Sequence, residues 1–295
     1  MHLTSPRRAV AALGIVAAAA LGVSTTAVAT PISTTPAPPA AAAIASGAIT
    51  DAAASVGQSA PPATAADKCA YYYCYDYVYG RQRVQSDGAS ATYDLAKPEI
   101  DPTDSVSHSL AEMAVQSADG NQIVEIGWTV DRSVNGDVHP HLFSFFWSDY
   151  EPTCYNTCGF VSTSDTIKPG MKLPSGGRVD LAIHHVEDRW ELSMNGTVFG
   201  YYPDSLWQGR YTRMGYLQVF GEVSGLKTPT CTDMGSGKRP TSAAATRISN
   251  VRLLGTEVAT NLTVKATEPS LYDVANVSAD AFSFGGPGTG SCHKQ

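Results

Sequence analysis

Two stretches of the chain alternate apolar and polar positions with a period of two, as β-strands do. In residues 122–130 one face is apolar and the other carries Glu125 beside Gly127. In residues 215–224 one face is apolar and the other carries Glu222, which follows Gly221 and has aromatic neighbours. The apolar positions of the two stretches are Val124, Ile126, Trp128, Val130, Leu217, Val219 and Val223. The pattern predicts two strands that pack apolar faces into a core and present one carboxylate each on the opposite face.

Two such strands in one antiparallel sheet would bring Glu125 and Glu222 to the same concave face. Two close carboxylates do not both ionise readily, so one group can act as an acid and the other as a base. Such a pair predicts a bell-shaped rate profile confined to acid pH. A glutamate on the polar face of a strand also serves solubility in many proteins, so the pattern alone does not decide.

The remaining pattern predicts short antiparallel strands separated by turns. Asn195-Gly196 is a strong hairpin signal between two apolar runs. The further predicted strands cover residues 107–116, 142–147, 179–183, 190–194, 198–202, 248–254 and 262–266. Phe143, Phe145 and Trp147 share one face, which we interpret as sandwich core rather than a substrate platform. The expected fold is an all-β antiparallel sandwich of the jelly-roll or concanavalin-like type, with one catalytic domain.

The first third of the chain differs in composition from the rest. Residues 1–29 have Arg7 and Arg8, a short apolar run and Ala27-Val28-Ala29, which indicate a secretory signal peptide rather than a membrane anchor. Residues 30–66 are rich in Ala, Pro, Ser and Thr and predict a disordered spacer. Residues 67–90 form a Cys/Tyr-rich segment that suits an added strand, a flap or a surface patch. The predicted catalytic domain is 91–295.

Charge and histidine placement exclude several functions. The 295 residues carry a net charge of −7, only 16% of them are charged, and no basic run occurs, so nucleic acid and membranes are not expected partners. His139, His141, His184 and His185 lack a completing carboxylate or thiolate at ligand spacing. We therefore expect no metal and no cofactor. A Gly-x-Ser-x-Gly nucleophile elbow is also missing from the sequence.

An ordered series of motifs resembles the neprosin family of glutamic peptidases. The resemblance runs from about Ala91 to Cys292, in the family's order and at similar spacing. Its motifs are IVEIGW, NGD followed by LFSFFWSDY, CYNTCGF, the run from Trp190 to GYYPDSL, FGEV and MGSG. The resemblance implies a β-sandwich peptidase whose catalytic glutamates are Glu125 and Glu222, and it suggests cleavage after proline. Predicted substrate contacts are Trp128, Gln218, Tyr201, Gly235 and Ser236.

Six cysteines in a secreted chain predict a disulfide framework. Cys154 and Cys158 flank a short loop and match the family's cysteine pair there. Cys69 and Cys74 bracket a short tyrosine run and are expected to pair locally. The remaining pair is Cys231–Cys292.

The function predicted from the sequence is a secreted, extracellular glutamic endopeptidase, a monomer acting on polypeptides that include proline-rich ones. Two alternatives stay open at this point. Sandwich glycoside hydrolases also use two carboxylates. A non-catalytic module that binds carbohydrate or protein through the tyrosine-rich segment would need no carboxylate pair.

Overall fold

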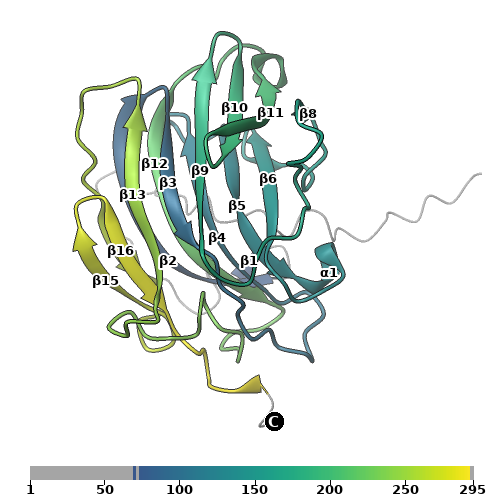
Figure 1. The fold of residues 1–295 in the computed structure, drawn as a ribbon, viewed down its shortest axis with the longest axis vertical. Helices are drawn as coiled ribbons and strands as arrows, with labels where there is room; N and C mark the ends of the chain where they lie inside the picture. The colour runs from purple at the N-terminus through teal and green to yellow at the C-terminus, as the bar shows by residue number, and fades with distance from the viewer. Residues whose placement is uncertain (1–68, 71–72, 293–295) are drawn as a thin grey trace, which may run out of the picture. The chain divides into compact units, whose positions relative to one another are not determined.

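The computed structural model describes residues 69–70 and 73–292. The predicted signal peptide (1–29) and spacer (30–66) lie outside the described residues. Strands dominate the described part and form two antiparallel sheets (Figure 1). The predicted all-β sandwich is confirmed. No helix among the described residues has the length and apolarity needed to cross a membrane.

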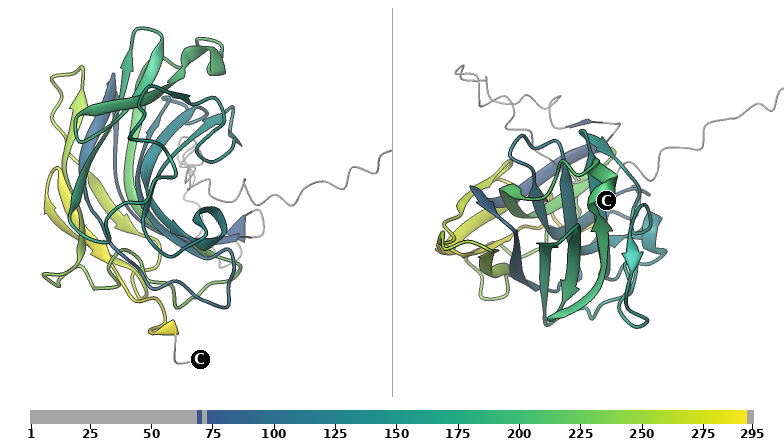
Figure 2. Two further views of the ribbon diagram at one scale, coloured as in Figure 1. Left: turned by 45° about the vertical axis from the view of Figure 1, so that its right-hand side comes forward. Right: turned by 90° about the horizontal axis from the view of Figure 1, so that it is seen from above.

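The first sheet carries both glutamates. Its strand β12 lies between β2 and β4, and β5 and β6 follow outward from β4. The strands of this sheet are β1 (Cys69–Ala70), β2 (Tyr73–Ser86), β12 (Met214–Gly225), β4 (His108–Gln116), β5 (Ile123–Asp131), β6 (His141–Ser148), β7 (Glu151–Pro152) and β14 (Thr263–Ala266), which pairs with β2. Figure 2 shows this sheet curved, with the face turned away from the second sheet on the inside of the curve.

The second sheet covers the convex side of the first. Its strands, in spatial order, are β15 (Asp273–Ser278), β16 (Ala281–Gly285), β13 (Thr246–Leu254), β3 (Gly88–Asp94), β9 (Arg178–Val186), β10 (Arg189–Met194), β11 (Thr197–Pro203) and β8 (Val161–Ser162). Asn195 and Gly196 join β10 to β11 with φ of 50° and 77°. Two positive φ values define the type I′ turn that the Asn-Gly pair predicted.

Two short helices begin directly after strands of the sandwich. Helix α1 (Arg132–Asn135) follows β5 directly, and the carboxylate of Asp131 caps it by accepting from the backbone N–H groups of Ser133 and Val134. Gly136 ends the helix in the left-handed conformation, at φ 76°. The short 3-10 helix η4 (Asp204–Trp207) follows β11.

The core lies between the two sheets and contains the faces predicted for β5 and β12. Val124, Ile126, Trp128, Val130, Leu217 and Val219 are all 0% exposed. The rings of Trp190 and Tyr211 stack in this core with their centroids 4.4 Å apart. Truncating a buried ring of this size to alanine typically costs about 3–5 kcal/mol, so these aromatic side chains hold the sheets together.

A second apolar cluster covers the opposite, concave face of the first sheet. It contains Phe143, Phe145 and Trp147, so the interpretation of these rings as sandwich core is wrong. The reason is that every residue of β4 and β5 is buried, on both faces. When both faces of a sheet are covered, apolar content does not indicate which one faces the core.

The tyrosine-rich segment supplies a strand of the sandwich. Residues 73–86 form β2, which pairs along its length with β12. Tyr75, Tyr77 and Tyr79 alternate with core-facing positions and join the concave cluster. Of the three possibilities considered for the tyrosine-crowded stretch 69–79, the described residues 73–79 show the added strand. The sandwich therefore extends to Tyr73, before the predicted domain boundary at residue 91.

Candidate active site

Strand register places Glu125 and Glu222 on the same face of the first sheet. Glu222 on β12 pairs with Leu110 on β4, and Glu125 on β5 pairs with Ala114 on β4. Leu110 and Ala114 are four residues apart on one strand, so their side chains point the same way. The two glutamates therefore share the concave face, and both are 0% exposed.

The two glutamates are not neighbours in the sheet. Strand β4 separates them, and their partners on β4 are four residues apart. On a flat sheet this offset would put their Cα atoms on the order of 15 Å apart. The sheet curves toward this face (Figure 2), so side chains on it lie closer together than they would on a flat sheet.

A third carboxylate lies on the strand between them. Glu112 on β4 pairs with Gly127 on β5 and with Phe220 on β12, so it is a diagonal neighbour of both Glu125 and Glu222. Diagonal neighbours across strands are about 7–8 Å apart, within reach of long side chains. Glu112 is 0% exposed. We refer to Glu125, Glu112 and Glu222 as the carboxylate row.

A histidine contacts one end of the carboxylate row. Nε2 of His108 lies 2.8 Å from Oε1 of Glu222, and its Nδ1 lies 3.6 Å from Oδ2 of Asp131. Burial by itself lowers the pKa of His108, but the hydrogen bond to Glu222 and the charges of Glu222 and Asp131 outweigh it. The pKa of His108 is therefore raised above its ordinary value, which favours an imidazolium at this position.

Aromatic rings surround the other end. The indole N–H of Trp147 donates to Oε1 of Glu125 at 3.3 Å. Phe145 pairs with Glu125 across β5 and β6, and its ring lies edge-on to that of Trp147 with centroids 6.0 Å apart. The two ends of the row therefore differ: Glu222 contacts an imidazole, whereas Glu125 contacts the indole N–H of Trp147.

Tyr155 lies near the row, on a loop that a disulfide closes. Its ring stacks on Phe143 with centroids 5.3 Å apart, and it is 9% exposed. Burial raises the pKa of the Tyr155 phenol well above its usual range, and the charges of Asp131, Glu112 and Glu222 raise it further. The phenol therefore stays protonated and can donate a hydrogen bond near the carboxylates.

The predicted substrate contacts divide between the two sides of the molecule. Gln218 lies on the concave face, in register with Ala114, and its Oε1 accepts from Gln116 at 2.6 Å. Trp128 points into the core, 0% exposed, because it alternates with Glu125, and its indole N–H donates to the backbone of Asp94. The structure therefore places Trp128 in the core between the sheets, on the face opposite Glu125.

The other three predicted contacts lie with the second sheet. Tyr201 is in β11 beside the buried Tyr202, and the guanidinium of Arg189 lies over its ring at 5.3 Å. Gly235 and Ser236 pack against Thr246 of β13, whose hydroxyl oxygen accepts from the Ser236 backbone N–H at 2.7 Å. The structure does not bring these three residues to the carboxylate row.

Two of the predicted disulfides are present. Cys154 is bonded to Cys158 and Cys231 to Cys292. Cys74 is also disulfide-bonded, and its backbone pairs with that of Cys69 between β1 and β2. The Cys69 side chain lies outside the described part, so the Cys69–Cys74 pairing stays a prediction.

Sequence reasoning missed Glu112, His108 and Tyr155. A signal was available for the first two, because His108, Glu112 and Gln116 are polar residues spaced four apart in a predicted strand. That spacing places three polar groups on one face. For Tyr155 the motif CYNTCGF marked the loop, but nothing in the sequence indicated that the loop lies near the glutamates.

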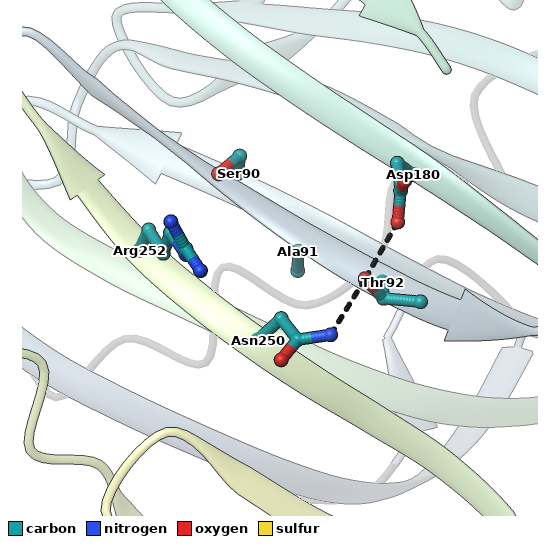
Figure 3. A pocket seen from close by; sticks show the side chains of 6 residues that line it. All are labelled: Ser90, Ala91, Thr92, Asp180, Asn250 and Arg252. Atoms are coloured by element: carbon teal, nitrogen blue, oxygen red, sulfur yellow. Dashed lines mark hydrogen bonds between the residues drawn. The ribbon is translucent and has the colours of Figure 1, made fainter. Parts of the chain in front are cut away.

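Other features of the described part do not compete with this site. No group of three or more His, Cys, Asp or Glu that could hold a metal occurs among the residues described. A polar hollow of about 350 Å³ lies on the second sheet, at Thr92, Asp180 and Asn250 (Figure 3). Its groups already bond to one another: the Thr92 hydroxyl donates to Asp180 at 2.6 Å and accepts from Asn250 at 3.2 Å.

Comparison with known proteins adds a family match. A model described as Neprosin matches residues 105–287. Scytalido-glutamic peptidase with a peptide-based transition state analog is 10% identical, with a TM-score of 0.39 over 71% of this chain and 97% of that one. SCP-B, an Eqolisin-family peptidase in complex with the tripeptide Ala-Ile-His, is 7% identical, with a TM-score of 0.36 over 71% and 96%. The chicken-liver agglutinin CG-16 is 12% identical, with a TM-score of 0.29 over 51% and 93%. No curated protein sequence matches the chain.

Proposed function

The chain belongs to the neprosin family and is a glutamic peptidase, and from this premise we propose that Glu125 and Glu222 are its catalytic pair. The observation that carries the proposal is their register: both point from neighbouring parts of the first sheet to one concave face. Both are fully buried there, among aromatic side chains. Burial in low dielectric is the environment in which a carboxyl group can be held as an acid or a base.

In the proposed reaction, one ionised glutamate takes a proton from a water molecule as the water oxygen attacks the carbonyl carbon of the peptide bond. The other glutamate, protonated, passes its proton to the carbonyl oxygen, which gives a tetrahedral diol. The first glutamate then returns its proton to the nitrogen, the C–N bond breaks, and the diol becomes a carboxylic acid as the second glutamate recovers its proton. Only the singly protonated pair is active, so we propose activity at acid pH.

We propose polypeptides containing proline as substrates, with cleavage on the carboxyl side of proline. The concave face supports this choice through flat rings: Tyr75 and Tyr77 stack at 6.0 Å, and Phe220 lies edge-on to Tyr77 at 6.0 Å. Aromatic faces pack well against a rigid pyrrolidine ring. The glycoside hydrolase alternative is not favoured, because the family is one of peptidases.

The test is digestion of a denatured protein at pH 2 to 8, with cleavage sites read by mass spectrometry. Glu125→Gln and Glu222→Gln should each abolish cleavage and leave the circular dichroism and melting curve near those of wild type. Glu257→Gln, on an exposed loop residue, is the matched control and should cleave normally. Near-normal turnover by either active-site variant would contradict the pair, and cleavage sites without proline would contradict the specificity.

We also propose that the protein is secreted and acts as a monomer. The two observed disulfides are compatible with an oxidising, extracellular environment. Mass spectrometry of the protein from culture supernatant should find an N-terminus at about Thr30. Size-exclusion chromatography with light scattering should give the mass of one chain.

A further inference from the structure

A buried histidine contacts the carboxylate row, and the reaction described above does not use it. The His108 side chain is 2% exposed and lies between Asp131 and Glu222. Asp131 is itself held in place, because its Oδ1 accepts from the backbone of α1 while its Oδ2 faces the imidazole. The imidazole is hydrogen-bonded to Glu222 through Nε2 and lies within ion-pair distance of Asp131 through Nδ1, so its Nε2 is directed at Glu222.

Asp131 on β5 and Glu222 on β12 contact the imidazole, and Glu112 points to the same face from β4. Tyr73 on β2 lies near Asp131 and Asp104, and Tyr155 lies near Asp131, Glu112 and Glu222. The two tyrosines have raised pKa values, first because of burial and then because of Asp131, so they stay neutral in acid. Of these groups, His108 is the one that can carry a positive charge.

At the far end of the row the indole N–H of Trp147 donates to Oε1 of Glu125, which pairs in register with Ala114 and Phe145. Two carboxyl groups at one site do not both ionise readily, so an ionised Glu222 favours a protonated Glu125. The geometry is therefore asymmetric, although the sequence presents Glu125 and Glu222 as an equivalent pair.

From this asymmetry, and resting on the proposed function, we infer that His108 is a positioning residue that keeps Glu222 ionised. Glu222 is then the base that takes the proton from water, and Glu125 is the acid that protonates the carbonyl oxygen. Oε1 of Glu222 is occupied by the imidazole, whereas Oε2 has no hydrogen-bond partner among the described residues. Oε2 is therefore the atom that accepts the proton of the water.

The first test is the pH profile of kcat/KM for a proline-containing peptide. In His108→Gln the amide can still donate to Glu222, but the positive charge is lost. A positive charge at this distance shifts the ionisation of a carboxyl group by roughly 1–3 pH units. Losing that charge should therefore move the acid limb of the kcat/KM profile to higher pH by the same amount. The variant's kcat should fall more than its KM changes. The control is His185→Gln, which removes a similar pair, His185–Asp204 at 3.0 Å, in the second sheet. The control profile should coincide with that of wild type, and a coincident His108→Gln profile would overturn the inference.

A second measurement does not depend on the activity or folding of His108→Gln. The ring ¹⁵N shifts of His108 in the wild-type protein report its protonation from pH 4 to 9. His108 should be doubly protonated throughout the pH range of activity, and Glu222→Gln should lower its titration midpoint. An active enzyme with a neutral His108 would overturn this inference alone. A wild-type protein that cleaves no peptide would refute the proposed function, and the assigned roles with it.

Discussion

The side chain of Glu112 occupies the space that Gly127 leaves on the neighbouring strand. A Cβ atom added to Gly127 would lie 2.5 Å from Cβ of Glu112 and 2.4 Å from the backbone oxygen of Ala111. Real Cβ atoms do not approach backbone atoms this closely, so no larger residue fits without displacing β4. Gly127, which lies on the same strand face as Glu125, thus makes room for a third carboxylate.

Glu112→Gln should move the basic limb of the kcat/KM profile to lower pH. A negative charge on Glu112 opposes the loss of the proton from Glu125, and the isosteric amide removes that charge. At about 7.5 Å and an effective dielectric of about 20, the coupling is about 2 kcal/mol, or roughly one to two pH units. The measurement is the profile from pH 2 to 8 on one peptide substrate.

The control for this variant is Glu191→Gln, which removes a carboxylate that pairs with Arg189 on the second sheet at 2.8 Å. Its profile should match that of wild type. If Glu112→Gln also left both limbs in place, Glu112 would not be coupled to the pair.

The period-two pattern was sufficient to predict which face of β5 and β12 carries the glutamates. Alternation is a property of the strand itself, so Val124 and Glu125 point to opposite sides whatever the strand pairs with. The Asn195-Gly196 hairpin was predictable for the same reason, since its backbone conformation depends on those two residues.

Strand order was not predictable in this way. Glu112 and His108 joined the site because β4 lies between β5 and β12, a pairing between residues far apart in the sequence. Phe143 was assigned to the wrong face because both faces of the first sheet are buried. The place of Tyr201 in the second sheet was not predictable either, because a motif position does not indicate which of two sheets carries it.

The free energy of unfolding should depend on pH through His108. Its pKa is raised in the folded protein, because its hydrogen bond to Glu222 and the charges of Glu222 and Asp131 outweigh burial. A raised pKa stabilises the fold at pH values below the unfolded pKa of about 6.5, and that stability is lost as pH rises through the folded pKa. Urea denaturation at pH 5 to 9 should therefore show wild type and His108→Gln becoming more alike as pH rises. A difference that stayed constant or grew with pH would contradict a charged His108.

Tyr155→Phe should lower kcat by about 10² or more with little change in KM. The phenol stays protonated next to Glu112 and Glu222, so it can donate to the oxygen that becomes negative during attack on the peptide bond. Loss of one such donor typically costs about 10²–10³ in kcat. The ring still stacks on Phe143, so the melting temperature should change little. Phe160→Leu in the same region, away from the row, tests for a general packing effect and should keep kcat. Equal kcat for Tyr155→Phe and wild type would exclude the phenol from the reaction.

The two observed disulfides should have different effects when removed. Cys154–Cys158 spans four residues and Cys231–Cys292 spans 61. In the chain-entropy model the short loop contributes about 2 kcal/mol and the long one about 4 kcal/mol to the stability of the fold. The short loop, however, carries Tyr155 and is bound to β6, where the backbone N–H of Asn156 donates to the carbonyl of Ser144 at 3.0 Å.

Replacing Cys154 and Cys158 by serine should therefore lower kcat more than it lowers stability, because Tyr155 loses its fixed position near the carboxylate row. Replacing Cys231 and Cys292 by serine should do the reverse, because that bond connects the C-terminal residues to the loop after β12, away from Tyr155. The measurements are the urea-derived free energy of unfolding and kcat at a temperature where both variants are folded. Loss of kcat in the second variant, with normal kcat in the first, would show that the loop does not position Tyr155.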